Sequence, residues 1–320
     1  MFEQRLTVII PTKNSEDTLE CCLASLRKQT IPINIIIIDG CSTDKTIEIA
    51  KKYGCSVYDE PKSLGRGSKR AIACNLGILH AKTVVPDILD LVAFLDSDTE
   101  VPETWASDMT NHPLLKNLKV AGITSGCEPD VSTELSRSIN TIMKLGSTHA
   151  QKFSEITPLD SIPGYNAVYR LGAISIVGGF DETIGGAEDF EINSRLRRVG
   201  YLLFGVPESP VVHHERKTIP NFMKQMVGYG WSWGRLLRVK HIFKFSRALP
   251  SLALLFIFGV FISASFYDIL RIPAIMFMLG LMTSIFMIEW EFSNKYYTLL
   301  RVFVVMQLSL ATGYIKGLLP

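Results

Sequence analysis

Short apolar runs alternate with amphipathic segments along the first two thirds of the chain. The runs Leu6–Pro11, Ile33–Ile38 and Leu91–Leu95 are too apolar for edge strands and predict buried, parallel strands. Apolar residues at helical spacing predict amphipathic helices over Asn14–Gln29, with Asn14 or Ser15 as its cap, and over Ala187–Val199. Strands and helices that alternate in this way indicate an α/β fold with a doubly wound sheet.

The same pattern predicts further elements between these segments. They are a helix from about Lys45 to Tyr53, a strand at Ser56–Tyr58, a helix within Gly65–Ala81, a strand at Val120–Ile123, a helix over Glu134–Gln151 and an extended segment over Gly164–Tyr169. No G-x-G-x-x-G follows the first strand, and no G-x-x-x-x-G-K-[ST] occurs. A dinucleotide-binding fold and a P-loop enzyme are therefore both disfavoured.

The composition becomes strongly apolar after about residue 249. Uncharged apolar runs over Leu249–Tyr267 and Ile272–Ile288 predict helices at about 249–267 and 272–290, which approach the thickness of a bilayer at a rise of about 1.5 Å per residue. A weaker third run covers about 297–318. Basic residues precede the first run: Arg235, Arg238, Lys240, Lys244 and Arg247. By the positive-inside bias we expect a multi-pass cell-membrane protein whose N-terminal domain is cytoplasmic, with two or three transmembrane helices.

The segment 217–247 mixes aromatic and basic residues and contains Trp231 and Trp233. Basic segments that carry tryptophan just before a membrane span lie in the lipid interface. Packing of this segment on the sheet is the alternative. Three glycines predict that it forms two separate helices: Gly228, Gly230 and Gly234.

Charge and cysteine content narrow the class of protein. The 320 residues include 33 Lys and Arg against 31 Asp and Glu, a net charge of +2, which argues against a nucleic-acid partner. All six cysteines lie in the first half of the chain without a C-x-x-C pair, which predicts reduced thiols in a cytosolic domain. Met1 leads into a charged segment and a strand, and we expect no signal peptide.

Acidic residues stand where three of these elements end or begin. Asp96 and Asp98 follow the central apolar run, Asp39 follows another, and Glu188 and Asp189 begin a helix. Open α/β sheets bind ligands at the carboxyl ends of their strands. Two hard oxygen ligands one residue apart suit Mg²⁺ or Mn²⁺ with a diphosphate. Each acid taken alone also fits a polar turn or a helix start.

The motifs around these acids resemble glycosyltransferase family 2, inverting GT-A enzymes that use nucleotide sugars. They occur in the family's order: TVIIPTKN at 7–14, IIDGCSTDKT at 37–46, N-x-G at 75–77, FLDSD at 94–98, GGFDE at 178–182, EDFEINSRLRRVGY at 188–201 and VVHH at 211–214. The resemblance implies the GT-A fold, a doubly wound mixed sheet, for this part of the chain.

The resemblance also implies how a donor is bound. Pro11 and Asp39 would contact the nucleotide. Asp98 would ligate a divalent cation, Mn²⁺ or Mg²⁺, with Asp96 on the ribose or on a metal-bound water. The cation would neutralise the leaving diphosphate. Candidate phosphate partners are Arg66, Lys69 and Arg70, although a solvated helix start explains these residues as well.

One position departs from the family pattern. The family often has arginine just before the asparagine of the N-x-G motif, whereas this chain has Cys74. Arg70 lies one helical turn earlier on the same face and can substitute for it.

Direct displacement at the sugar needs a single base for the acceptor hydroxyl. Glu188 and Asp189 point about 100° apart on a helix, so both cannot face the sugar. The family pattern implies Asp189 as the base, which leaves Glu188 to position the helix or the acceptor. Imidazole accompanies carboxylate at Mn²⁺ sites, so His213 or His214 would complete the metal site. The sequence does not show which of the two histidines is the ligand.

The implied function is transfer of one sugar from a nucleotide-diphosphate sugar to a lipid or lipid-linked glycan acceptor at the cytoplasmic membrane face. One alternative is a polyprenyl-phosphate hexose synthase, although the D-A-D-L-Q-H-P-P typical of those enzymes reads DSDTEVPE here. A nucleotidyltransferase and a non-catalytic membrane scaffold are further alternatives. The expected organisation is a cytosolic catalytic domain over 1–216, amphipathic basic interfacial helices over 217–247 and a transmembrane region over 248–320.

Overall fold

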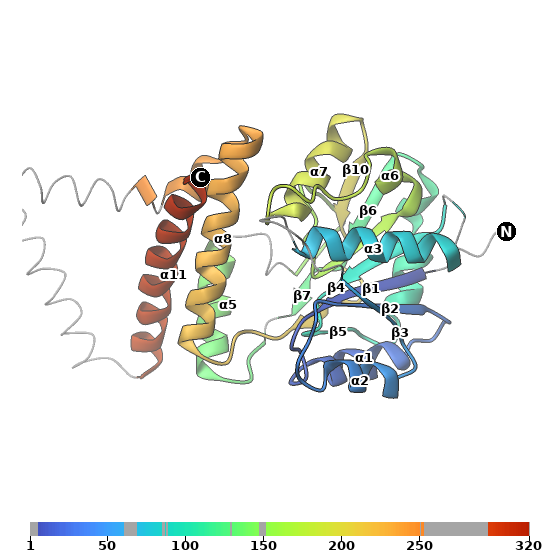
Figure 1. Ribbon diagram of the computed structural model, residues 1–320, viewed down its shortest axis with the longest axis horizontal. Helices are drawn as coiled ribbons and strands as arrows, with labels where there is room; N and C mark the ends of the chain where they lie inside the picture. The colour runs from blue at the N-terminus through green and yellow to red at the C-terminus, as the bar shows by residue number, and fades with distance from the viewer. Residues whose placement is uncertain are drawn as a thin grey trace, which may run out of the picture. The chain divides into compact units, whose positions relative to one another are not determined.

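A computed structural model describes residues 6–60, 69–84, 87, 89–128, 130–146, 152–249, 251–252 and 294–319. The chain divides into two compact units (Figure 1). The first comprises Met1–Asp130 and Gly146–His214, and the second comprises Val131–Leu145 and Glu215–Pro320. The assignment of residues 131–145 to the second unit does not follow from the hydrophobic pattern.

The first unit is built on an eight-stranded sheet in the order β3-β2-β1-β4-β9-β6-β10-β8. Its strands are β1 (Leu6–Thr12), β2 (Asn34–Asp39), β3 (Ser56–Asp59), β4 (Leu91–Leu95), β6 (Val120–Thr124), β8 (Thr157–Pro158), β9 (Asn166–Arg170) and β10 (Leu202–Gly205). Strands β3, β2, β1 and β4 are parallel, and β9 is antiparallel to both of its neighbours. The expected mixed α/β sheet is therefore confirmed.

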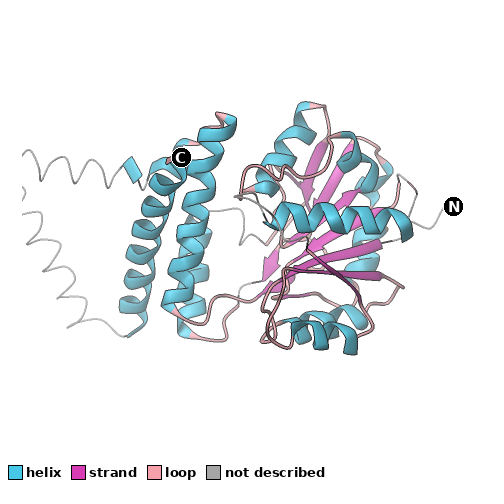
Figure 2. Ribbon diagram, in the orientation of Figure 1, coloured by secondary structure: helices cyan, strands magenta, loops and turns pink. Residues whose placement is uncertain are grey.

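Helices cover both faces of this sheet (Figure 2). One face packs against α1 (Leu19–Arg27), α2 (Thr46–Lys52) and α4 (Trp105–Thr110), and the other against α3 (Lys69–Val84), α6 (Leu171–Ile176) and α7 (Glu188–Arg198). In β1, Val8 and Ile10 point to the first layer and Ile9 points to the second. Because both faces are buried, the central strands are apolar at every position rather than at every second one.

The first helix begins later than the sequence predicts. The predicted helix starts at Asn14, but α1 starts at Leu19. The backbone N–H groups of Asn14 and Ser15 donate to Ser42 Oγ (2.8 Å) and Thr46 Oγ1 (2.7 Å). Residues 14 and 15 therefore join the loop after β2 instead of capping the helix.

A second, three-stranded sheet in the first unit has the order β5-β11-β7. Its strands are β5 (Thr99–Glu100), β7 (Cys127–Glu128) and β11 (Val211–His213). Strand β5 directly follows Asp98, and in the β5–β11 ladder His213 lies opposite Thr99. This pairing brings His213 beside two acids that are more than a hundred residues earlier in the chain.

The second unit contains α5 (Glu134–Gly146), α8 (Ile219–Lys240) and α11 (Asn294–Leu318). The predicted break of 217–247 at Gly228, Gly230 and Gly234 is wrong, because α8 continues through these glycines to Lys240 and helical structure resumes only at 245. A Cβ at Gly230 or Gly234 would overlap the backbone oxygen of Leu310 or Tyr314 in α11. These two glycines therefore permit close approach of two helices instead of ending one.

The glycines of α11 face α8 in the same way. A Cβ at Gly313 or Gly317 would overlap the backbone oxygen of Val227 or Trp231 in α8. Each helix thus contributes one G-x-x-x-G pair to the contact. An apolar cluster joins the three helices: Ile139, Ile142, Phe222, Met226, Val302 and Met306.

Only one of the three predicted membrane spans lies wholly within the residues that the structure describes. Among the helices that the structure describes, none is both long enough and apolar enough for a membrane span. The predicted third span, 297–318, coincides with α11. The predicted second span, and the first beyond residue 252, lie outside the described residues.

The glycine contact predicts opposite effects for two substitutions in α8. Gly230→Ala places a methyl group against Leu310 and should destabilise the α8–α11 pair by about 1–3 kcal/mol, as overpacking does. Gly228→Ala meets nothing within 4 Å and should raise stability by about 0.5–1 kcal/mol, because alanine favours helix. Thermal unfolding of the full chain, followed by circular dichroism, measures both. Equal stabilities for the two variants would contradict the contact.

Candidate active site

The ends of β4 and β11 bring together three candidate metal ligands. His213 Nε2 lies 3.2 Å from Asp98 Oδ1 and 3.8 Å from Asp96 Oδ2. One donor atom from each of the three residues lies within 4.8 Å of the others. Two carboxylates and an imidazole form a donor set that suits Mn²⁺, and the oxygens alone suit Mg²⁺. The residues therefore fit the expected divalent cation.

The two adjacent histidines face different partners. His214 Nε2 lies 2.6 Å from Glu100 Oε1, and its Nδ1 lies 3.8 Å from Asp130 Oδ2. The backbone N–H of His214 donates to Asp98 O at 2.9 Å. Of the pair that the sequence left open, His213 lies with the acids, and His214 attaches the end of β11 to β5.

Opposite charges shift the pKa values of these groups. Burial lowers the pKa of His213, but Asp98 and Asp96 outweigh burial and hold it well above its ordinary value. Burial raises the pKa of Asp96, but Arg70 and His213 outweigh it and hold this pKa below its ordinary value. The cluster thus keeps Asp96 in the ionised form that a cation ligand requires.

Arg70, on α3, lies among the acids. Its NH1 is 2.5 Å from Asp96 Oδ1 and its Nε is 3.0 Å from Glu188 Oε1. Its NH2 donates to Gly164 O at 2.9 Å. The other predicted phosphate partners are not placed: Arg66 and the side chain of Lys69 lie outside the described residues.

The predicted base and its neighbour occupy the first turn of α7. Asp189 Oδ2 accepts from Gly164 N–H at 3.3 Å, and Oδ1 accepts from Phe190 N–H at 2.7 Å. Glu188 is buried against Arg70. Burial raises the pKa of Glu188 to about 7, with Arg70 opposing this shift and Asp189 adding to it. The two carboxylates face different partners, as their spacing on a helix predicts.

Asp39, at the end of β2, is fully buried and bonded within its own loop. Its Oδ2 accepts from Ser42 N–H at 2.8 Å, and its Oδ1 accepts from Ser42 Oγ at 2.6 Å. The carboxylate thus bonds the residue three positions on and closes its own loop. Pro11 lies opposite Ile38 in the β1–β2 ladder. The nucleotide contacts of Asp39 and Pro11 remain predictions.

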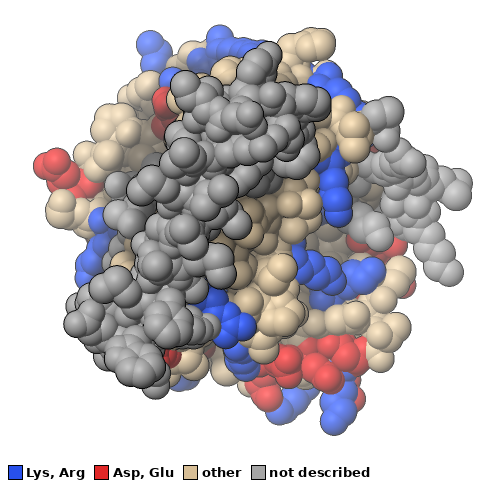
Figure 3. Space-filling view, turned by 90° about the vertical axis from the view of Figure 1, so that its left-hand side faces the viewer, with Lys and Arg blue, Asp and Glu red and all other residues tan. Residues whose placement is uncertain are grey.

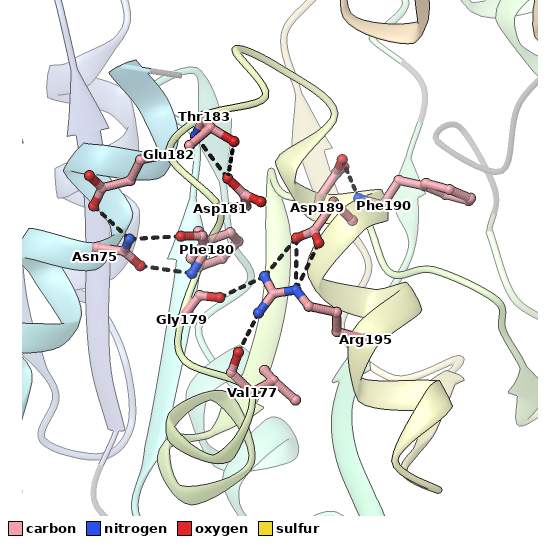
Figure 4. A network of polar contacts seen from close by, with 11 residues as sticks. Asn75, Val177, Gly179, Phe180, Asp181, Glu182, Thr183, Asp189, Phe190 and Arg195 are labelled. Atoms are coloured by element: carbon pink, nitrogen blue, oxygen red, sulfur yellow. Dashed lines mark hydrogen bonds and ion pairs between the residues drawn. The ribbon is translucent and has the colours of Figure 1, made fainter. Parts of the chain in front are cut away.

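The N-x-G and GGFDE motifs hold a loop beside the acids (Figure 4). Asn75 of α3 donates to Phe180 O at 2.9 Å and accepts from Phe180 N–H at 2.8 Å. Gly179 has φ of 75°, and a Cβ there would lie 2.7 Å from Asn75 Oδ1. From the other side, Arg195 of α7 donates to Gly179 O at 2.7 Å. These motif residues position the loop between α3 and α7.

The sequence interpretation missed two residues of the site, Gly164 and Tyr165. It assigned both to an extended segment, but β9 starts only at Asn166. Gly164 contacts both Arg70 and Asp189, and the Tyr165 ring lies 4.8 Å from the His213 ring. The available signal was a proline and a glycine directly before an apolar strand.

The mixed sheet and the acids at its carboxyl edge define a transferase of the GT-A type. The chain belongs to glycosyl transferase family 2: the model of that family matches residues 7–175, more than half of the 320 residues. The predicted enzyme class is thereby confirmed. Asp189 and His213 lie beyond the matched residues, so their candidacy depends on geometry and on the motif resemblance.

The chain is also similar to two curated relatives and to one solved structure. It is 28% identical over 243 residues to the pre-mycofactocin glycosyltransferase of Mycobacterium tuberculosis, covering 74% of this chain but 48% of that protein. It is 26% identical over 246 residues to a dolichyl N-acetyl-α-D-glucosaminyl phosphate 3-β-D-2,3-diacetamido-2,3-dideoxy-β-D-glucuronosyltransferase of Methanococcus voltae, covering 73% and 74%. The chain thus spans about half the length of the first relative.

The solved structure is the mannosyltransferase PcManGT from Pyrobaculum calidifontis in complex with GDP-Man and Mn²⁺. The likeness has a TM-score of 0.66 at 17% identity and covers 99% of this chain and 88% of that one. It supports the fold.

The metal cluster predicts a specific loss on substitution of one acid. Asp98→Asn should abolish metal-dependent binding of a nucleoside diphosphate and keep the fold, because the amide removes a charge from the ligand set. Calorimetry with GDP and UDP, with and without Mn²⁺, measures this. Glu100→Gln, whose partner is His214, is the matched control and should retain Mn²⁺ dependence. Undiminished Mn²⁺ dependence in Asp98→Asn would show that Asp98 is not a ligand.

The raised pKa of Glu188 predicts a pH dependence of stability. The pKa is about 7 in the folded protein against an ordinary 4.5, so the folded state binds the proton more tightly. The resulting stabilisation is full below pH 4.5 and is lost as the pH rises through about 7. Glu188→Gln cannot titrate, so the Tm of the wild type should fall relative to this variant across that window. Parallel Tm profiles, measured in chelator-treated protein, would contradict the shift.

Proposed function

We propose that this chain is an inverting glycosyltransferase that moves one sugar from a nucleotide-diphosphate sugar to a lipid or lipid-linked acceptor at the cytoplasmic face of a membrane. The observation that carries the proposal is the pair of acidic sites linked by Arg70. Asp96, Asp98 and His213 form one site, and Glu188 and Asp189 form the other. A metal-dependent donor and a base for the acceptor require these two functions side by side.

Asp96, Asp98 and His213 would hold the divalent cation, Mn²⁺ or Mg²⁺. When bound, the cation supplies a positive charge that neutralises the leaving diphosphate. Asp189 would accept the proton of the acceptor hydroxyl. Its carboxylate accepts two backbone N–H groups, which fix its orientation. Glu188, held by Arg70, would position the first turn of α7.

The lipid acceptor is supported by the relatives and by the second unit. The name of one relative contains dolichyl N-acetyl-α-D-glucosaminyl phosphate, a lipid-linked sugar phosphate. In the second unit, large apolar side chains are exposed near the end of α8: Val239, Phe243, Phe245, Leu249 and Leu252. On the face in Figure 3, Lys and Arg side chains are scattered among uncharged ones, and a group of Asp and Glu side chains lies near its lower edge. Exposed apolar and basic side chains together suit a membrane surface with anionic lipids, which would also account for the expected membrane location.

A donor and acceptor screen with the full chain tests the proposal. UDP- and GDP-sugars are offered with polyprenyl phosphate, with a lipid-linked saccharide or with water, each with and without Mn²⁺. Mn²⁺-dependent transfer to a lipid-linked saccharide supports the proposal, and transfer to polyprenyl phosphate assigns the chain as a hexose synthase. Formation of a nucleotide sugar from a sugar phosphate would instead indicate a nucleotidyltransferase. Absence of donor turnover with every acceptor would favour a scaffold.

The assignment of the base predicts a split between two neighbouring acids. Asp189→Asn should keep donor binding and lose transfer by about 10²–10⁴-fold, because an amide cannot take the acceptor proton. Glu188→Gln should reduce turnover less and affect acceptor KM more. Initial rates with the pair found in the screen, together with calorimetry of donor binding, measure both variants. Near-normal turnover in Asp189→Asn with collapse in Glu188→Gln would reverse the two roles.

A further inference from the structure

Three nitrogens of the Arg70 guanidinium contact three separate segments of the first unit. NH1 pairs with Asp96 after β4, Nε pairs with Glu188 at the start of α7, and NH2 donates to Gly164 in the loop before β9. These segments are far apart in sequence. A planar guanidinium can satisfy several partners in fixed directions, which a lysine ammonium cannot do.

The contact with Gly164 leads directly to the candidate base. The carbonyl oxygen of Gly164 accepts from Arg70 at 2.9 Å, and the backbone N–H of Gly164 donates to Asp189 Oδ2 at 3.3 Å. One residue therefore separates the guanidinium from the carboxylate that would take the acceptor proton. A Cβ at Gly164 would lie 3.1 Å from Arg70 Nη2, so an alanine here would push the guanidinium by a few tenths of an ångström.

The charge of Arg70 is already compensated by its partners. Asp96 and Glu188, at 2.5 and 3.0 Å, bring two acidic groups to one cation. A cavity of about 10 Å³ is lined by Arg70 and by both acids of α7, together with apolar and aromatic side chains. The side chain of Glu188 is only 10% exposed, so its pair with Arg70 is screened less than a surface pair, whereas Asp96 is 31% exposed. Arg70 is thus a poor candidate for a free cation that waits for a diphosphate.

We propose that Arg70 is a positioning residue that orients the candidate base Asp189, through Gly164 and Glu188, rather than a ligand of the donor diphosphate. The inference rests on the proposed function and deepens it. Arg70 opposes the repulsion between the neighbouring carboxylates 188 and 189 and holds the first turn of α7 against the loop before β9. Removal of the guanidinium should therefore impair the transfer step and spare donor binding.

The test separates kcat from donor affinity in the full chain. Arg70→Met should lower kcat by about 10²-fold, the scale of a misplacement near 1 Å, and leave the Kd for GDP or UDP with Mn²⁺ within about twofold. Arg70→Lys should recover little, because one ammonium cannot replace three directed contacts. Gly164→Ala should lower kcat in the same way while Arg70 remains present. Arg197→Met, which removes a surface pair with Asp160, is the control and should change neither quantity.

Two results would overturn the inference. One is a Kd for the nucleoside diphosphate that rises at least tenfold in Arg70→Met with kcat unchanged. The other is full rescue by Arg70→Lys, since a charge alone would then suffice. If Arg70→Met does not fold, Arg70→Lys and Gly164→Ala decide the question.

A failure of the proposed function can be distinguished from a failure of this inference. If the wild type transfers no sugar in the screen, the proposed function fails. The positioning role of Arg70 is then tested by amide hydrogen exchange, which does not depend on activity. Faster exchange of residues 163–165 and of the first turn of α7 in Arg70→Met, relative to Arg197→Met, supports the positioning role. Unchanged exchange at both places overturns it.

Discussion

Four carboxylates crowd the carboxyl edge of the sheet, and their mutual repulsion is the constraint that the surrounding structure relieves. Asp96 and Asp98 stand against His213, whose positive form they favour, and Arg70 lies between Asp96 and Glu188. Like charges so close together remain ionised only when opposite charge or directed hydrogen bonds compensate them. The same crowding suits the site to a divalent cation on one side and to a proton acceptor on the other.

The fold assembles these groups by pairing distant segments. The small β5-β11-β7 sheet attaches His213 beside the acids of β4, and His214 ties that strand to Glu100. On the opposite side, Asn75 and Arg195 hold the 178–182 loop between α3 and α7. The glycines and amides of the motifs thus act on backbone geometry, while the acids they position are the candidate metal ligands and base.

The sequence predicts the sheet, its main helices and most of the acids of the site, because burial on both faces and strand-end carboxylates leave clear local patterns. Local patterns do not show which residues contact one another in the folded chain, and the wrong predictions concern such contacts. Ser15 joins the loop after β2 instead of capping α1, and Gly230 and Gly234 admit a second helix instead of breaking α8. The register of the β5–β11 ladder decides that His213, and not His214, lies beside the acids. The role of Gly164 depends on its contact with Arg70, which is distant in sequence.

The central claim is that Asp189 is a single base acting across the site from the cation, which requires direct displacement at the anomeric carbon. The most direct test is the anomeric configuration of the transferred sugar in the product, read by NMR from the couplings of its anomeric hydrogen. An α-linked donor should yield a β-linked product. An α-linked product would mean retention, which one base acting by direct displacement does not produce, and would contradict the account.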